Sequence, residues 1–149
     1  MRAVKHIMLW VISSVLYTLA YFGLELLEGN KISTTDYYGF RNLGFVTIFL
    51  MYLLSSVLYP IVLFPLAWVV RKLANPFIDR LMILALSGIG GYVLFHMSYE
   101  SRFIEEYHLD SRTAIILYVI AGFIYVLVDY YLEKTDSLYN DSSSTKEER

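Results

Sequence analysis

Three ionisable residues lie in otherwise apolar stretches of the sequence: Glu25, His96 and Asp129. A charged group inside a membrane segment is costly and commonly marks a functional site. Glu25 and Asp129 lie near the ends of their stretches. Contact with water at a membrane surface is therefore the alternative interpretation for both.

Some of the histidines and acidic residues have the types that ligate metals. Glu100 follows His96 by four residues, and Glu105 and His108 have Glu-x-x-His spacing. Imidazole and carboxylate groups suit divalent cations. Because a solvated loop explains the same residues, we predict neither a metal site nor a cofactor.

Hydroxyl side chains recur at helical spacing in four apolar stretches. Steps of three or four residues place them on one face of a helix, and in lipid such hydroxyls bond across helices. Tyr17, Tyr59, Tyr92 and Tyr125 each fall near the middle of a stretch, which predicts one layer of four tyrosines. They are either structural or line a hydrated path or ligand pocket. The candidate interior residues are Ser14, Tyr17, Glu25, Ser56, Tyr59, Tyr92, His96, Tyr125 and Asp129.

Small residues form a patch in the third apolar stretch, at Ser87-Gly88-Ile89-Gly90-Gly91. Ser87 and Gly91 are four residues apart, and small side chains at this spacing allow two membrane helices to approach closely. We predict that Ser87, Gly88, Gly91 and Gly122 pack helices together within one chain. A self-association face is the alternative.

The sequence contains no motif that points to catalysis. It has no cysteine, which excludes disulfides, thiolate catalysis and cysteine-ligated metals. No nucleophile motif, phosphate-binding glycine loop or HExxH motif occurs. The net charge of -2, without a basic block, does not suggest nucleic acid. We predict that the protein is not an enzyme, has no catalytic residues and binds no nucleic acid.

The apolar stretches that carry these residues are long enough to cross a membrane. Hydrophobic residues make up 57% of the chain and charged residues 17%, against about 25% charged in soluble domains. A bilayer core about 30 Å thick needs about 20 apolar helical residues. We predict a membrane domain at 1–134, with helices at about 4–27, 43–70, 78–98 and 112–132. Residues 135–149 should form a disordered, polar cytoplasmic tail.

Local signals refine these helices. Pro60 and Pro65 should kink or tilt the second helix, because each removes a backbone donor. Residues 102–107 could form a helical turn lying on the membrane. Either Asp110 or Ser111 should cap the last helix.

The distribution of basic residues predicts the orientation. The N-terminus, the connection after the second helix and the tail hold eight of the 12 lysines and arginines, and the other two loops hold four. Basic residues favour the cytoplasmic side. The predicted fold is all-α: an integral four-helix bundle of the cell membrane, with antiparallel up-down topology and both termini cytoplasmic.

Three segments carry a resemblance to a known family: residues 12–22, 57–65 and 122–129. They resemble parts of an uncharacterised family of small four-span membrane proteins found mainly in Bacillus-type bacteria. The shared pattern is a Ser-Ser…Tyr first span, a proline-interrupted second span, a short basic turn and an acidic residue ending the last span. The resemblance implies a fold and a topology, but no activity.

Three classes of function are compatible with this sequence. The first is a non-catalytic membrane protein, such as an immunity, defence or regulatory subunit, that acts through helix contacts. Its partners would be the lipid bilayer and another copy or another membrane protein. The second is an oligomeric pore or small transporter with a polar interior of tyrosine, serine and glycine. The third, a membrane enzyme, has the least support, and we predict the first.

Overall fold

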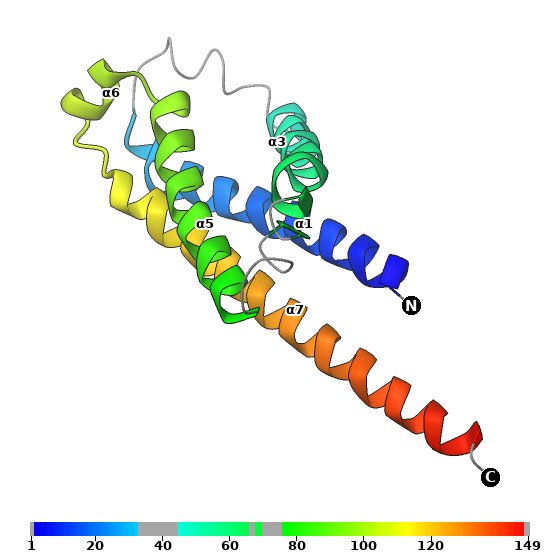
Figure 1. The fold of residues 1–149 in the computed structure, drawn as a ribbon. Helices are drawn as coiled ribbons and strands as arrows, with labels where there is room; N and C mark the ends of the chain where they lie inside the picture. Colours follow the sequence, from blue (N-terminus) through cyan, green and yellow to red (C-terminus); the bar gives the residue numbers. More distant parts are fainter. Residues whose placement is uncertain (1, 33–44, 66–67, 70–75, 148–149) are drawn as a thin grey trace.

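The computed structural model describes the backbone of residues 2–32, 45–65, 68–69 and 76–147, and the described residues contain no strand. The predicted all-α class is confirmed. Figure 1 shows the arrangement of α1, α3, α5 and α7 and of the short helix α6. The elements are α1 (Arg2–Leu27), η1 (Gly29–Lys31), α3 (Phe45–Leu58), η2 (Tyr59–Leu63), α5 (Pro76–Ser98), α6 (Ser101–Glu106) and α7 (Ser111–Glu147).

Three helical segments are long and apolar enough to cross a membrane: Val4–Lys31, Phe77–Ser98 and Ser111–Thr135. A shorter apolar helix covers Ile48–Leu63. Many large apolar side chains are exposed, including Met97 at 82% and Ile61 at 65%. Soluble monomers rarely expose large contiguous apolar surfaces. The structure is therefore compatible with a membrane protein.

The second apolar stretch changes its helical hydrogen bonding at Tyr59. The α-helix ends at Leu58, and the π-helix η2 follows, with Pro60 inside it. Proline lacks the N–H of the helical ladder, so the bonding pattern has to adjust around it. The interruption falls at one of the two prolines where a kink is predicted. The predicted range of 43–70 also includes residues outside the described part of the chain.

Two ion pairs join the helices at one end of the assembly. Lys5 Nζ of α1 lies 3.1 Å from Asp129 Oδ1 of α7. Arg80 Nη2 of α5 lies 3.0 Å from Glu133 Oε2 of α7. The starts of α1 and α5 therefore both lie beside the later part of α7.

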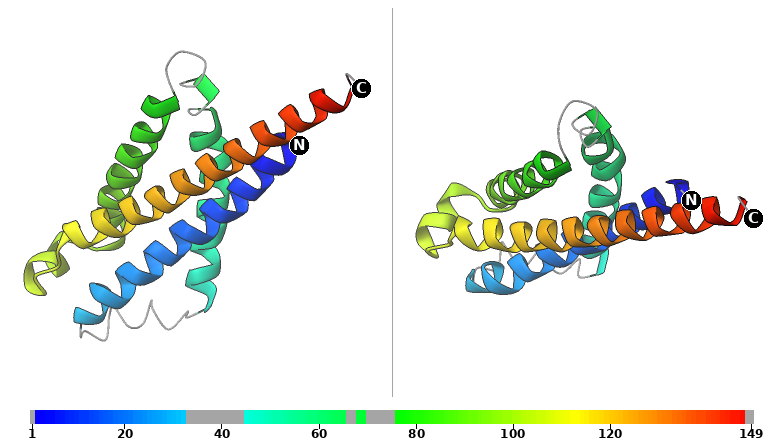
Figure 2. Two further views of the ribbon diagram at one scale, coloured as in Figure 1. Left: turned by 90° about the horizontal axis from the view of Figure 1, so that it is seen from below. Right: turned by 60° about the horizontal axis from the view of Figure 1, so that its bottom comes forward.

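Hydrogen bonds join the same helices at the opposite end. The Tyr99 hydroxyl, just after α5, donates to Glu25 of α1 at 3.3 Å. The Asp110 backbone N–H, just before α7, donates to Glu28 at 3.1 Å. The later parts of α1 and α5 therefore lie near the start of α7. Accordingly, α1 and α5 run in one direction and α7 in the other, and Figure 2 shows α1 and α7 side by side.

The helix α3 packs against α1 in the opposite direction. The His6 ring meets the Phe64 ring edge-on, with 5.2 Å between centroids. The Trp10 indole N–H donates to the Ser56 carbonyl oxygen at 2.7 Å. The later part of this helical segment therefore lies beside the start of α1. In contrast, α3 and α5 have no extensive contact with each other.

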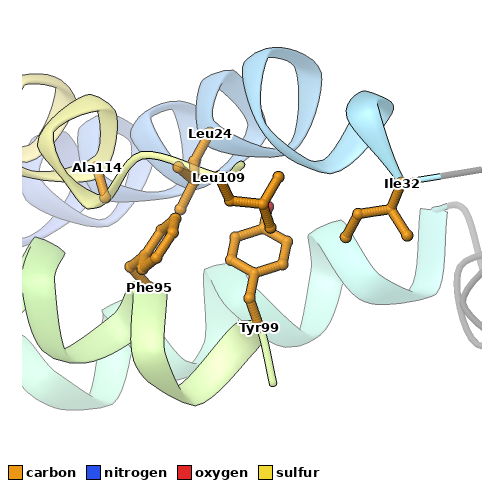
Figure 3. Close-up of a cluster of buried hydrophobic side chains, with 6 residues drawn as sticks. All are labelled: Leu24, Ile32, Phe95, Tyr99, Leu109 and Ala114. Carbon is orange, nitrogen blue, oxygen red and sulfur yellow. The ribbon is translucent and has the colours of Figure 1, made fainter. Parts of the chain in front are cut away.

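Buried apolar side chains fill the space between α1, α5 and α7. Figure 3 shows the cluster near the start of α7, which joins α1, α5 and the two connections at that end. Its members are Leu24, Ile32, Phe95, Tyr99, Leu109 and Ala114. A second cluster lies toward the ion-paired end and also includes a residue of η2. Its members are Leu9, Tyr59, Ile83, Tyr125 and Val126.

Small residues allow α5 and α7 to cross closely. A Cβ atom on Gly91 would lie 2.8 Å from the Ala114 carbonyl oxygen and 2.9 Å from Tyr118 Cβ. A Cβ atom on Gly122 would collide with Ser87 Oγ. At Gly88 the nearest atom would be 3.3 Å away, on Val119. Gly91 and Gly122 thus lie where close packing excludes a larger side chain, and Gly88 lies in a less tight part of the same crossing.

The structure differs from the predicted disordered tail, because α7 continues as a helix to Glu147. In Figure 1 this extension projects beyond the other helices. Adding residues to an existing helix avoids the cost of nucleation, since each one gains a backbone hydrogen bond. Polar composition alone therefore does not mark the end of this helix.

The connection between α5 and α7 follows two local predictions. The predicted turn at residues 102–107 corresponds to α6. After it, His108 has a φ of 50°, in the left-handed region that ends the turn. Of the two predicted caps, Asp110 makes the contact: its Oδ1 accepts the Arg112 backbone N–H at 2.9 Å.

Candidate functional site

A groove of about 270 Å³ opens between α3 and α5. Side chains of α1 and α7 close its back, and its walls are almost entirely apolar. No charged residue lines it within the described part of the chain. The lining residues are Tyr17, Tyr21, Met51, Leu54, Ser55, Leu58, Val62, Leu63, Leu86, Ser87, Ile89, Gly90, Leu94 and Tyr118.

Gly90 leaves space in the wall of this groove. A Cβ atom built on it would meet no other atom within 4 Å, in contrast to the tight position of Gly91. An apolar cavity of about 150 Å³ is enough to bind benzene. The groove therefore has room for an apolar ligand group larger than a single ring.

A short chain of hydrogen bonds lies at the back of the groove. The Tyr17 hydroxyl lies 2.8 Å from Ser87 Oγ. Ser87 Oγ itself donates to the Ile83 carbonyl oxygen at 2.8 Å. Tyr17 is consequently the donor in its contact with Ser87. The bonds link α1 to α5 and satisfy the polar groups of both side chains within the protein.

The hydroxyl group of Tyr118, unlike that of Tyr17, has no hydrogen-bond partner among the described residues. Its ring stacks on the Tyr17 ring with centroids 5.9 Å apart and planes 26° apart. The side chain lines the groove and is only 6% exposed. Among the described residues, none forms a hydrogen bond with its hydroxyl. A nearly buried phenol thus has an available donor at the groove.

Replacing Tyr17 with phenylalanine should reduce the free energy of unfolding by about 0.6 kcal/mol, the average for a hydrogen bond between membrane helices. The effect is small because the ring stack remains and Ser87 keeps its bond to Ile83. Titration of the purified protein in micelles with a denaturing detergent, followed by circular dichroism, measures the change. Tyr92→Phe is the control, because Tyr92 is 48% exposed. A loss above about 2 kcal/mol would contradict this structural role.

Glu25, a predicted interior candidate, is held by two tyrosine hydroxyls. Tyr21 on the same helix donates to its Oε1 at 3.1 Å, and Tyr99 donates to the same oxygen at 3.3 Å. The carboxylate is partly buried. These contacts join the ends of α1 and α5, so a structural role explains the position.

Sequence reasoning does not single out Glu28, which directly follows the predicted helix at 4–27. Its side chain is buried, and its Oε2 pairs with Lys31 Nζ at 2.7 Å. Its Oε1 accepts the Thr113 hydroxyl at 2.7 Å, and its Oε2 accepts the Asp110 N–H. An anion is favoured at this position because it lies beside the N-terminus of α7. The sequence feature that could have indicated a paired Glu28 is Lys31, three residues later, which forms the ion pair with it.

Changing Glu28 to glutamine should lower the free energy of unfolding by about 1 kcal/mol, because a neutral amide accepts these bonds more weakly. The same detergent titration measures the loss. Glu106→Gln is the control, since Glu106 is exposed and lies 4.0 Å from Arg102 in an ion pair at the surface. Equal effects of the two changes would show that Glu28 does not join α1 to α7.

Asp129 is more deeply buried than its position near a helix end suggested. The side chain is 1% exposed, and its partner Lys5 is 12% exposed. The interpretation that water reaches Asp129 at the membrane surface is therefore wrong for this structure. The buried carboxylate is neutralised by a lysine from the start of α1.

The predicted layer of four tyrosines does not form. Tyr59 and Tyr125 make an edge-on pair with centroids 6.3 Å apart. Tyr17 pairs instead with Tyr118, and Tyr92 is exposed. Four-residue spacing explains the difference, because the inward face of α5 is formed by Ile83, Ser87, Gly91 and Phe95. Tyr92 follows Gly91 by one residue and so lies about 100° around the helix.

The other candidate residues have separate local environments. Ser14 is buried, and its hydroxyl donates to the Trp10 carbonyl oxygen of its own helix at 2.8 Å. Ser56 is half-buried on α3. His96 is exposed rather than interior and packs edge-on against Tyr92 with centroids 4.5 Å apart. The nine candidates thus do not gather into one site.

The histidines and acidic residues considered for metal binding do not form a metal-binding cluster in the described part of the chain. Glu105 and His108 are exposed at α6 and the turn after it. Within the residues that the structure describes, no group of three or more histidine or acidic side chains is placed to hold a metal ion.

Comparisons with protein-family models, curated proteins and solved structures found no match to this chain. The function proposed below is therefore argued from the residues and their geometry.

Proposed function

We propose that this protein is a non-catalytic, four-span integral protein of the cell membrane that acts by binding a partner within the bilayer. Both termini are cytoplasmic, as the eight-to-four distribution of basic residues indicates. The shared direction of α1 and α5 is the observation that carries the proposed topology.

The contacts at the two ends of the assembly support four crossings. Since α1 and α5 run in the same direction, the chain between them must return to the side where α1 began. The helical segment from Phe45 to Pro65 is about 30 Å long, which matches the hydrocarbon thickness. It also packs antiparallel to α1, as its contacts near His6 and Trp10 require. These directions support the proposed up-down-up-down topology.

The groove between α3 and α5 supports a binding role. It opens between two apolar helices, and in a bilayer its mouth would face the lipid phase. The partner predicted from the sequence is a helix of another copy or of another membrane protein. The part of the partner that enters this groove must be narrow and uncharged, because the groove is small and its described lining carries no charge.

The contacts of the polar residues favour binding over a pore. The hydroxyls of Ser13 and Ser14 donate to the Trp10 carbonyl oxygen, and Thr18 donates to the Ser14 carbonyl oxygen. These groups are used within α1, and Tyr17 is used between helices. A water-filled path needs such groups to remain available to water or ions.

Reconstitution into liposomes tests the non-conducting role. We expect vesicles containing the purified protein to release a trapped ion-sensitive dye, K⁺ or Cl⁻ no faster than protein-free vesicles. A pore-forming protein in parallel vesicles is the positive control. Flux that rises in proportion to the amount of this protein would overturn the proposal in favour of the pore.

A further inference from the structure

We propose that the second helical segment is hinged between Ser56 and Leu63, and that α3 swings about this hinge relative to α5. The groove between the two helices then changes its width with the hinge angle. This property goes beyond the proposed function. It concerns contacts within one chain and does not depend on the number of membrane crossings.

A proline removes one backbone hydrogen bond at the hinge, and Trp10 replaces it. In an α-helix the Ser56 carbonyl oxygen would accept the N–H of residue 60, but this residue is proline and has none. The Trp10 indole N–H donates to that oxygen at 2.7 Å instead. The π-helix η2 begins just beyond, at Tyr59. Prolines and π-turns are the usual places where helices bend, so the segment has a defined weak point here.

The part of the segment that follows this point is fixed to the other helices. Tyr59 is only 5% exposed and belongs to the buried cluster that joins α1, α5 and α7. Its ring meets the Tyr125 ring of α7 with centroids 6.3 Å apart. The Phe64 ring meets the His6 ring of α1 with centroids 5.2 Å apart. Contacts with two helices therefore hold this side of the hinge in place.

The part before the hinge is held much less. Among the described residues α3 packs against α1 but has no extensive contact with α5 or α7, and Figure 1 shows it apart from α5. Four side chains near its start are exposed: Val46, Ile48, Phe49 and Leu50. A hinge commonly consists of a few residues that absorb the change in backbone angles between a fixed and a moving part. The arrangement here has both parts.

The facing wall of α5 leaves space for this motion. A Cβ atom on Gly90 would meet no other atom within 4 Å, and small residues allow helices in a membrane to approach closely. Phe49 lies about 15 Å along the helix from Tyr59. A swing of about 20° would therefore move position 49 by about 5 Å.

Distances between two spin labels test the swing. The chain has no cysteine, so Phe49→Cys and Val93→Cys provide one site on α3 and one on α5, both exposed and outside the groove lining. Electron–electron double resonance of the purified protein in lipid nanodiscs should show two populations about 5 Å apart. Pro60→Ala supplies the missing N–H and should leave one population. Pro65→Ala is the matched control, because Pro65 lies outside η2, and it should retain both.

A double-mutant cycle tests the role of Trp10. Detergent titration followed by circular dichroism gives the folding equilibrium constants. Trp10→Phe should lower this constant by a factor that includes about threefold for the lost hydrogen bond, the average between membrane helices. In the Pro60→Ala background the loss should be about threefold smaller, because the N–H of residue 60 then bonds Ser56. In the Pro65→Ala background the loss should be unchanged.

A leucine at position 90 tests the direction of the swing. Gly90→Leu should remove the shorter-distance population, because its side chain fills the space toward which α3 moves. Ala85→Leu should retain both populations, since Ala85 is exposed on the same helix and does not line the groove. If Pro60→Ala does not fold by circular dichroism, this pair of variants provides the test.

Four results would overturn the hinge. A single population in the unchanged protein would show that α3 does not swing. Equal effects of the two proline variants on the distances would remove the role of Pro60. An equal loss from Trp10→Phe in all three backgrounds would show that Trp10 does not replace the missing N–H. Equal distances in Gly90→Leu and Ala85→Leu would show that α3 does not move toward Gly90. Failure of the four-span topology would instead defeat the proposed function and leave these distances unchanged.

Discussion

Replacing Gly91 with alanine should destabilise the protein by about 3 kcal/mol, near the upper end for overpacking a well-packed site. The added Cβ would lie 2.8 Å from a backbone carbonyl oxygen of Ala114 and 2.9 Å from Tyr118 Cβ. Neither atom is the end of a flexible side chain, so α5 and α7 would have to move apart. Detergent titration followed by circular dichroism measures the change in the free energy of unfolding.

Gly90 provides a control on the same helix, one residue away. A Cβ atom there meets nothing within 4 Å, so Gly90→Ala should leave stability unchanged or raise it by up to about 1 kcal/mol through helix propensity. Equal destabilisation by the two alanines would contradict the close crossing of α5 and α7. Equal tolerance of both would contradict it as well.

Changing Lys5 to methionine should cost about 3 kcal/mol, because it leaves the buried Asp129 carboxylate without its lysine partner. The Asp129→Asn change in the same background should restore much of that loss. The four proteins form a double-mutant cycle whose coupling energy measures the pair. The same detergent titration provides the four free energies.

An exposed ion pair serves as the comparison for this cycle. Arg102 and Glu106 lie 4.0 Å apart with side chains 75% and 52% exposed. Arg102→Met should therefore change stability by no more than about 0.5 kcal/mol. A Lys5→Met effect as small as this would show that the start of α1 is not fixed to α7 by the buried pair.

Much of the helical architecture could be predicted because it depends on local chemistry. Long apolar stretches predict helices, and the short polar sequence before Ser111 predicts a cap that Asp110 provides. Pro60 lies where the hydrogen bonding changes from α to π. The continuation of α7 to Glu147 was not predicted, because helix elongation depends on an existing helix as well as on composition.

The candidate site was harder to predict because it depends on how helices rotate and pair. The spacing of the hydroxyl residues indicates which helices carry tyrosines in the interior. It does not show that Tyr17 pairs with Tyr118 rather than with Tyr92. Glu28 was missed because its partners Asp110 and Thr113 are distant in the sequence. The groove likewise depends on α3 and α5 failing to pack together, which no single helix reveals.

The four-span topology is tested most directly by finding on which side of the membrane single introduced cysteines lie. The chain has no cysteine, so Arg2→Cys, Ser101→Cys and Lys134→Cys each introduce one reactive position. Each variant is treated with a membrane-impermeant maleimide, first on intact cells and then after permeabilisation. Four spans predict that the cysteine at position 101 is labelled on intact cells, and that those at 2 and 134 are labelled only after permeabilisation. Labelling of positions 2 and 134 from opposite sides would contradict the four-span membrane protein.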